Sequence, residues 1–212
     1  MESAILCPLC STPSDLYYQS RKKTFLRCCN CSGVFLHPAQ RLSADAEKQR
    51  YQFHQNDVED KGYQAYMQPL TDRVMANHII SHTGLDFGSG PSSVVAKLLR
   101  DKGFSMTVYD PYFFDDRKLL LNQYDFITCT EVMEHFYSPL ESFTILFKML
   151  VQNGKLYCTT RLYLPEIDFS SWFYKNDATH VFFYTPETIS FISSKAGFSN
   201  FIIEDKLIVF EK

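Results

Sequence analysis

Residues 85–93, Leu85-Asp86-Phe87-Gly88-Ser89-Gly90-Pro91-Ser92-Ser93, decide the fold of this chain. They end a short apolar run that predicts a strand, and residues 92–102 follow with apolar side chains on one helical face. Gly88 and Gly90 permit positive φ and let a ligand approach the backbone closely. A strand, a glycine turn and a helix form the unit from which open α/β sheets are built, with ligands beyond the carboxyl ends of the strands.

The rest of residues 83–212 continues this alternation. We expect strands at 106–109, 124–130 and 156–160, a closing antiparallel pair at 201–203 and 207–210, and helices at 66–82, 140–150 and 186–196. Asn153-Gly154 is expected to stop the second helix, and Thr185 and Gly197 are expected to bound the third. The predicted fold class is α/β, with a doubly wound, Rossmann-like, mostly parallel sheet and an antiparallel last strand.

A carboxylate stands at the end of the second predicted strand. Asp110 follows Gly90 by 20 residues and precedes Pro111. At this place a carboxylate accepts hydrogen bonds from the ribose hydroxyls of a bound nucleoside. Nicotinamide dinucleotides use the same geometry, but Ser93 stands where their motif has its third glycine, which disfavours an oxidoreductase.

The chain resembles the class I S-adenosylmethionine-dependent methyltransferases over residues 83–212. The resemblance rests on Asp86-x-Gly88-x-Gly90, Asp110, Tyr124-Asp125-Phe126-Ile127 with residues 131–135 (EVMEH), and residues 150–154 (LVQNG), although Lys155 replaces a second glycine. It implies a methyltransferase whose cofactor, S-adenosylmethionine, contacts a defined set of residues. That set is Asp86, Gly88, Ser89, Gly90, Asp110, Pro111 and Glu131.

The chain departs from this family between Asp110 and Tyr124, where only 13 residues remain. The family usually places a helix and a third strand there, with a residue that contacts adenine. Phe113, Phe114, Asp115 and Asp116 are all candidates for that contact, and the sequence does not choose among them.

Two carboxylates and an imidazole follow the central strand, and a second histidine comes later. We expect Glu134, His135 and His180 to be the catalytic residues, with a histidine acting as general base. Two alternatives stay open: these groups and Glu131 bind a divalent cation such as magnesium, or Glu134 and His135 only brace the next helix. The segment is locally similar to magnesium-dependent small-RNA 2′-O-methyltransferases and to ubiquinone-pathway O-methyltransferases.

Four of the seven cysteines form two Cys-x-x-Cys pairs, Cys7/Cys10 and Cys28/Cys31, separated by 17 residues. This spacing is typical of a closed Cys₄ zinc site with a structural role. Within such a ribbon, Tyr17-Tyr18 and residues 24–27 predict a hairpin. Arg21, Lys22 and Lys23 would lie on its turn, either solvated or in contact with RNA.

The sequence divides into a zinc ribbon (1–38), a helical bridge or lid (39–82) and the methyltransferase domain (83–212). In the bridge, residues 44–52 predict a helix, and His54, Asn56 and Tyr63 are candidates for ligand contact. After the fifth strand, Phe169, Trp172, Phe173 and Tyr174 predict either an apolar substrate wall or ordinary packing.

The composition narrows the remaining choices. A net charge of −3 and a hydrophobic content of 45% indicate a folded domain without a general affinity for nucleic acid. No apolar run is long enough for a membrane helix and no secretory signal is visible, so we expect a cytoplasmic protein. A small-molecule acceptor is favoured over RNA, and a non-catalytic module that binds a partner through its ribbon is the alternative from another class.

Overall fold

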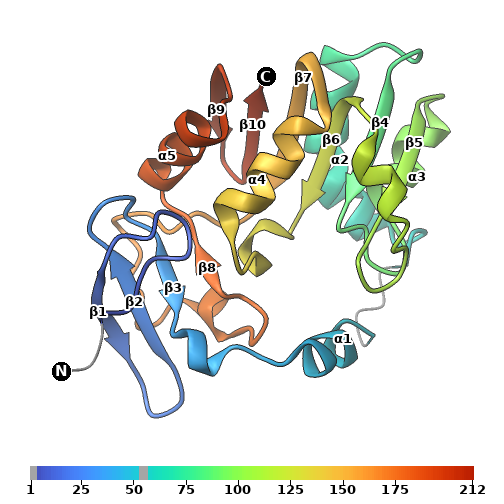
Figure 1. The fold of residues 1–212 in the computed structure, drawn as a ribbon. Helices are drawn as coiled ribbons and strands as arrows, with labels where there is room; N and C mark the ends of the chain where they lie inside the picture. Colours follow the sequence, from blue (N-terminus) through green and yellow to red (C-terminus); the bar gives the residue numbers. More distant parts are fainter. Residues whose placement is uncertain (1–3, 53–56) are drawn as a thin grey trace.

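The computed structural model describes residues 4–52 and 57–212, which form two β-sheets (Figure 1). The larger sheet has six strands in the order β5-β4-β6-β7-β10-β9. Their bounds are β4 (Thr83–Phe87), β5 (Ser105–Tyr109), β6 (Tyr124–Thr130), β7 (Leu150–Thr159), β9 (Asn200–Glu204) and β10 (Leu207–Glu211). Strands β4 to β7 are parallel, and β10 runs antiparallel to both of its neighbours. The expected mostly parallel sheet with an antiparallel end is confirmed.

Helices cover both faces of this sheet. On one face, α2 (Lys61–Asn77) and α3 (Val94–Asp101) pack against Phe126, and on the other α4 (Pro139–Lys148) and α5 (Pro186–Ala196) pack against Ile127. Phe126 and Ile127 are adjacent in β6 and both fully buried, as expected for a central strand whose side chains alternate between two covered faces. The sheet is therefore doubly wound.

The helix limits follow from local capping. Helix α5 spans the predicted residues, with the Thr185 side chain accepting a hydrogen bond from Thr188 N and Gly197 ending it at φ 100°. The helix predicted at 66–82 was wrong at both ends. Helix α2 begins earlier, where the Asp60 side chain accepts a hydrogen bond from Gly62 N, and it ends earlier, at Asn77. None of the helices within residues 4–52 and 57–212 has the length and apolar character needed to cross a membrane.

The expected helix stop at Asn153-Gly154 was also wrong. Helix α4 already ends at Lys148, and the two residues lie inside β7. There Asn153 adopts φ 64°, and the register between β6 and β7 shifts. Backbone hydrogen bonds with Lys212 hold this irregular segment in place, so an asparagine–glycine pair that favours turns forms a bulge within a strand.

The short connection after Asp110 contains no additional strand in the described chain. Residues Arg117–Leu121 form a single 3₁₀ helix, η2, and the chain then enters β6. Strand β5 is consequently the edge of the sheet, and the loop after Asp110 folds back through hydrogen bonds between Asp110 and Phe114. This places residues 111–113 directly beside the carboxyl ends of the strands.

The smaller sheet contains β1 (Ser14–Gln19), β2 (Thr24–Cys28), β3 (Val34–Leu36) and β8 (Phe182–Phe183). The predicted hairpin is present as β1 and β2. Strand β8, however, comes from the C-terminal stretch and pairs with β3. Helix α1 (Ala44–Gln52) connects this sheet to the remainder and lies across the carboxyl ends of the large sheet (Figure 1).

Candidate active site

The glycine loop is held open by its own backbone conformation. Gly88 and Gly90 have φ values of 78° and 64°, and a Cβ on Gly88 would lie 2.5 Å from a methyl carbon of Val132. Residues other than glycine rarely adopt this region, and the close approach of Val132 excludes a side chain at position 88 in any case. The loop therefore presents bare backbone to the space above β4.

Asp86 supports the loop from below. Its carboxylate accepts hydrogen bonds of 2.6 Å from both Ser93 Oγ and Thr128 Oγ1, and it is 2% exposed. Burial raises the pKa of this carboxyl above its usual value. Asp86 and Ser89 border a minor cavity of about 30 Å³ and not the main one. These two predicted cofactor contacts therefore do not line the main cavity.

Asp110 lies opposite the glycine loop. Its Oδ2 accepts a hydrogen bond from Gly90 N at 2.9 Å, and its Oδ1 accepts from Tyr112 N at 2.8 Å and Phe113 N at 3.1 Å. These bonds fix the carboxylate at the ends of β4 and β5. The side chain thus joins the glycine loop to the shortened connection.

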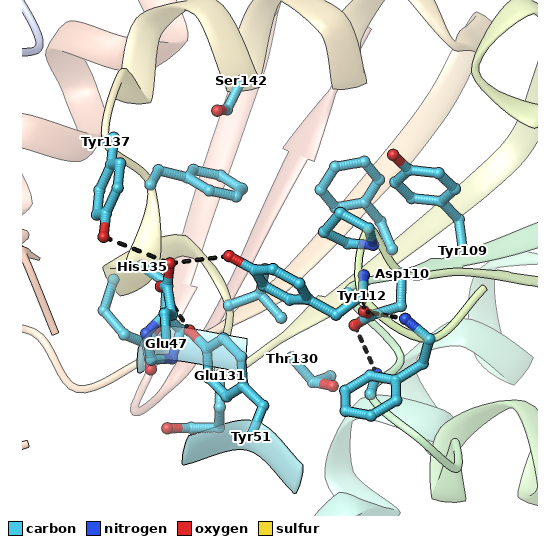
Figure 2. Close-up of a pocket in the computed structure, with 18 of the residues that line it drawn as sticks. Glu47, Tyr51, Tyr109, Asp110, Tyr112, Thr130, Glu131, His135, Tyr137 and Ser142 are labelled. Atoms are coloured by element: carbon cyan, nitrogen blue, oxygen red, sulfur yellow. Dashed lines mark hydrogen bonds between the residues drawn. The ribbon is translucent and has the colours of Figure 1, made fainter. Parts of the chain in front are cut away.

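A cavity of about 640 Å³ opens over this edge of the sheet, which is within the range of small-molecule sites, roughly 300–1,000 Å³ (Figure 2). One part is bordered by the glycine loop and the Asp110 region, and another by the histidine segment. The predicted site residues that line it are Gly88, Gly90, Asp110, Pro111, Glu131, Glu134, His135 and His180. Of the four candidates for adenine contact, only Phe113 lines it.

His135 and His180 meet in this cavity although they are far apart in sequence, with ring centroids 5.0 Å apart. His135 Nδ1 lies 2.9 Å from the Thr179 carbonyl, and His180 Nδ1 lies 2.8 Å from the Tyr174 carbonyl. Because a carbonyl only accepts, each Nδ1 carries the proton and each Nε2 keeps its lone pair. Burial lowers the pKa of both rings, that of His180 to about 4, so both are neutral at pH 7.

Glu134 is the most buried acid of the site, with no exposed surface. It accepts hydrogen bonds from Tyr174 OH and, at 3.2 Å, from Thr160 Oγ1. Burial and the nearby Glu131 carboxylate raise the pKa of Glu134 to about 8. Ligand atoms of Glu134, His135 and His180 lie within 4.8 Å of one another, so a divalent cation is geometrically feasible here.

Sequence reasoning missed Glu47, which lines the cavity from α1. Its carboxylate accepts hydrogen bonds from Tyr51 OH at 3.0 Å, Tyr112 OH at 2.9 Å and Tyr137 OH at 3.3 Å (Figure 2). Helix α1 is polar throughout, so the sequence contained no signal that one of its acids is 5% exposed. Tyr63, a predicted contact, also lines the cavity, whereas His54 and Asn56 lie outside the described residues.

The aromatic cluster after β7 does not line the cavity. Phe169 and Trp172 pack with Phe25 and Phe183 between the ribbon and the loop, and Phe173 is 60% exposed. Tyr174 does not line the cavity either, but its hydroxyl donates hydrogen bonds to Glu131 and Glu134. Phe169 and Trp172 therefore pack in the protein interior and do not form a substrate wall.

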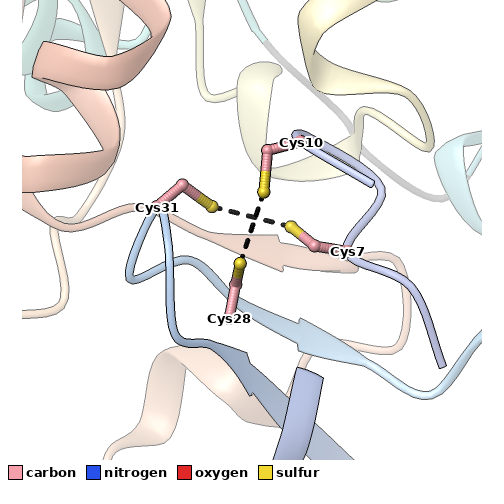
Figure 3. Close-up of side chains that lie close together, drawn as sticks. All are labelled: Cys7, Cys10, Cys28 and Cys31. Atoms are coloured by element: carbon pink, nitrogen blue, oxygen red, sulfur yellow. Dashed lines mark hydrogen bonds between the residues drawn. The ribbon is translucent and has the colours of Figure 1, made fainter. Parts of the chain in front are cut away.

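The four paired cysteines converge in the ribbon (Figure 3). Cys7 Sγ lies 3.6 Å from Cys31 Sγ, and Cys10 Sγ lies 3.3 Å from Cys28 Sγ, with all four sulfurs within 4.8 Å of one another. Four thiolates about 2.3 Å from a tetrahedral zinc ion would be about 3.8 Å apart. The donor set and its spacing therefore fit zinc.

A family model described as a methyltransferase domain matches residues 41–201. No protein with a curated description matches the sequence. Similar folds occur in an O-methyltransferase family protein from Burkholderia thailandensis (13% identity, TM-score 0.56, 78% of this chain and 61% of that one) and in human N-acetylserotonin methyltransferase in complex with SAM (15%, 0.55, 80% and 56%).

A SAM-dependent methyltransferase from Archaeoglobus fulgidus is also similar, at 13% identity and a TM-score of 0.54 over 68% of this chain and 94% of that one. The chain thus spans under two thirds of the Burkholderia and human proteins. At these identities the structural likeness concerns the fold, while the family match covers most of the sequence. The chain belongs to the methyltransferase domain family and has the class I fold of S-adenosylmethionine-dependent methyltransferases.

Proposed function

We propose that this enzyme transfers a methyl group from S-adenosylmethionine to a small-molecule acceptor. The observation that carries the proposal is a single cavity bordered by Gly88, Gly90 and Asp110 on one part and by His135 and His180 on another. The first group would hold the nucleoside and the methionine part of the cofactor. The second would hold the acceptor beside it.

The chemistry asks little of the protein beyond alignment. The acceptor's lone pair attacks the methyl carbon, the carbon–sulfur bond breaks, and its electron pair stays on sulfur, which leaves neutral S-adenosylhomocysteine. A proton released by the acceptor can pass to Nε2 of His135 or His180, each of which keeps its lone pair because Nδ1 is bound to a carbonyl. Glu134 would hold residues 134–135 in place through its hydrogen bonds with Thr160 and Tyr174.

Binding of a divalent cation is the second candidate role for Glu134, His135 and His180. The geometry that favours it is the hydrogen bond from each Nδ1 to a backbone carbonyl. Histidines that bind a metal through one ring nitrogen usually donate the other to such a group. Two imidazoles and one carboxylate suit a transition-metal ion better than magnesium, which prefers oxygen ligands. Loss of activity in the presence of EDTA, restored by manganese but not by magnesium, would support this role over a simple base.

The ribbon cysteines are proposed to hold a structural zinc ion. Backbone amides such as Asn30 N, 3.4 Å from Cys28 Sγ, point toward the sulfurs and would stabilise thiolates. All four protein ligands are supplied, so no position remains for a substrate. The ion would therefore stabilise the ribbon and take no part in methyl transfer.

Calorimetric binding of S-adenosylmethionine and S-adenosylhomocysteine tests the proposal most directly. Asp110→Ala is expected to weaken both, since it removes the ribose acceptor and releases the loop at Gly90. Asp115→Ala, a nearby acid outside the cavity lining, is the matched control. If neither ligand binds the folded, zinc-loaded protein, a non-catalytic module that binds partners through its ribbon becomes the better explanation. Binding of a nicotinamide dinucleotide instead would favour an oxidoreductase.

A further inference from the structure

The main cavity is rich in acidic side chains. The carboxylic acids that line it are Glu47, Asp110, Glu131, Glu134 and Asp177, and neither lysine nor arginine lines it in the described part of the chain. A phosphate or carboxylate group would find no lysine or arginine among these lining residues.

Two of these acids are held by hydroxyl groups in place of counter-ions. Glu47 accepts hydrogen bonds from three tyrosines, and Glu131 accepts from Tyr66 at 3.0 Å and Tyr174 at 3.1 Å. Across residues 4–52 and 57–212, neither acid has a lysine or arginine nitrogen within 4.0 Å. Asp177 differs, since Arg50 binds both of its oxygens at 3.1 Å. The cavity therefore retains carboxylates that a ligand can neutralise.

The cofactor accounts for only part of this charge. If the proposed function is right, which this inference requires, S-adenosylmethionine brings one net positive charge to the part near Gly88 and Glu131. Glu47 lies at the other part, beside His135 and Tyr137 and away from Asp110 (Figure 2). Its carboxylate is left to the acceptor.

We propose that the acceptor carries a protonated amino group, which binds Glu47 among the rings of Tyr51, Tyr112 and Tyr137. A carboxylate that is 5% exposed attracts an ammonium ion through Coulomb attraction, and the rings of Tyr51 and Tyr112 add cation–π attraction. The ring of Tyr137 already has the Arg41 guanidinium 5.0 Å from its centroid. His180 lines the same cavity and is 9% exposed. Its Nε2 lies 3.9 Å from Glu134 Oε1, beyond hydrogen-bond distance, so a donor group of the acceptor can reach this nitrogen.

The test compares probes of similar size that carry end groups of different charge. Tyramine, tyrosol and 4-hydroxyphenylacetate share a phenol and end in an ammonium, a hydroxyl and a carboxylate, and equivalent trios can be built on aliphatic and sugar scaffolds. Each is titrated by calorimetry into the enzyme saturated with S-adenosylhomocysteine. We expect the ammonium member of a binding trio to bind about tenfold more tightly than its hydroxyl partner, and the carboxylate member to bind least.

Glu47→Gln tests the assigned residue, since it keeps the size and a hydrogen-bond acceptor but removes the charge. It should abolish the ammonium preference while leaving the affinity for S-adenosylhomocysteine unchanged. Asp45→Asn, which removes an exposed carboxylate from the same helix outside the cavity lining, is the matched control and should keep the preference. Thermal unfolding of both variants checks the fold.

Each outcome bears on a different statement. If S-adenosylhomocysteine does not bind, the proposed function fails. If it binds but no ammonium compound does, if carboxylates bind equally well, or if Glu47→Gln keeps the preference, the amine inference is overturned and the proposed function stands. Short single-stranded RNA, added as a competitor, should not displace a bound amine.

Discussion

Lys23→Met is the most informative single substitution in the ribbon. The Lys23 ammonium donates hydrogen bonds to three consecutive backbone carbonyls, those of Lys175 at 2.9 Å, Asn176 at 3.2 Å and Asp177 at 2.8 Å. Burial at this contact lowers the pKa of Lys23 below its usual value. Three residues further along, the same loop carries His180, so the hairpin of the ribbon holds the backbone that positions a histidine of the site.

The magnitude follows from those bonds. A hydrogen bond to a charged group contributes roughly 1.5–3 kcal/mol, but three bonds to one half-buried ammonium are not additive, because water replaces part of them. We expect Lys23→Met to lower the free energy of unfolding by about 2 kcal/mol. For a chain of this size, that corresponds to a fall in the melting temperature of about 4–8 °C.

The assay pairs thermal unfolding with hydrogen exchange of residues 174–180 and calorimetric binding of S-adenosylhomocysteine. Lys22→Met is the control, since Lys22 is exposed on the same turn and its ammonium has no partner in residues 4–52 and 57–212. Lys23→Met should accelerate hydrogen exchange in residues 174–180 and leave the affinity for S-adenosylhomocysteine unchanged. Equal melting temperatures and equal exchange for the two variants would refute the reasoning.

Three further predictions concern the zinc site, Glu134 and the glycine loop. Cys10→Ser should reduce bound zinc, measured by elemental analysis, and lower the melting temperature, whereas Cys29→Ser, outside the cluster, should change neither. The free energy of unfolding of the wild type, measured relative to that of Glu134→Gln, should fall as pH rises, by up to about 5 kcal/mol between pH 4.3 and 8. The folded carboxyl has a pKa of about 8, against about 4.3 unfolded, and so holds a proton that the unfolded chain releases. Urea unfolding at pH 5 and pH 8 measures this, and a constant difference would contradict it. Gly88→Ala should weaken S-adenosylhomocysteine binding, because φ 78° costs an alanine about 1–2 kcal/mol and its Cβ would meet Val132; unchanged affinity would show that the loop does not contact the ligand.

Local chemistry explains why much of the fold was predictable. Strand β6 is rich in aromatic and β-branched residues, and α5 has a threonine cap and a glycine stop, so both were located to the residue. The glycine loop was recognisable because positive φ at Gly88 and Gly90 leaves few other residue choices. The two cysteine pairs were equally clear, since metal ligation imposes a fixed spacing.

Two elements were predicted wrongly, one through a distant partner and one through a local cap. Asn153-Gly154 favours a turn by itself, but pairing with the C-terminal Lys212 draws it into β7. The prediction for α2 was displaced along the sequence because the first turn of the helix carries little hydrophobic signal. The helix starts where the Asp60 side chain caps it. In both cases a few hydrogen bonds outweighed the local propensity.

The candidate site divides in the same way. The sequence by itself determined the glycine loop, Asp110, the Glu134-His135 segment and the cysteine set, because each is a short motif whose spacing reflects its chemistry. Only the tertiary structure brought Glu47 from a polar helix into the cavity and turned Lys23 from a hairpin tip toward the loop of His180. Burial and partners of that kind arise when distant segments pack together, and residue type alone does not specify them.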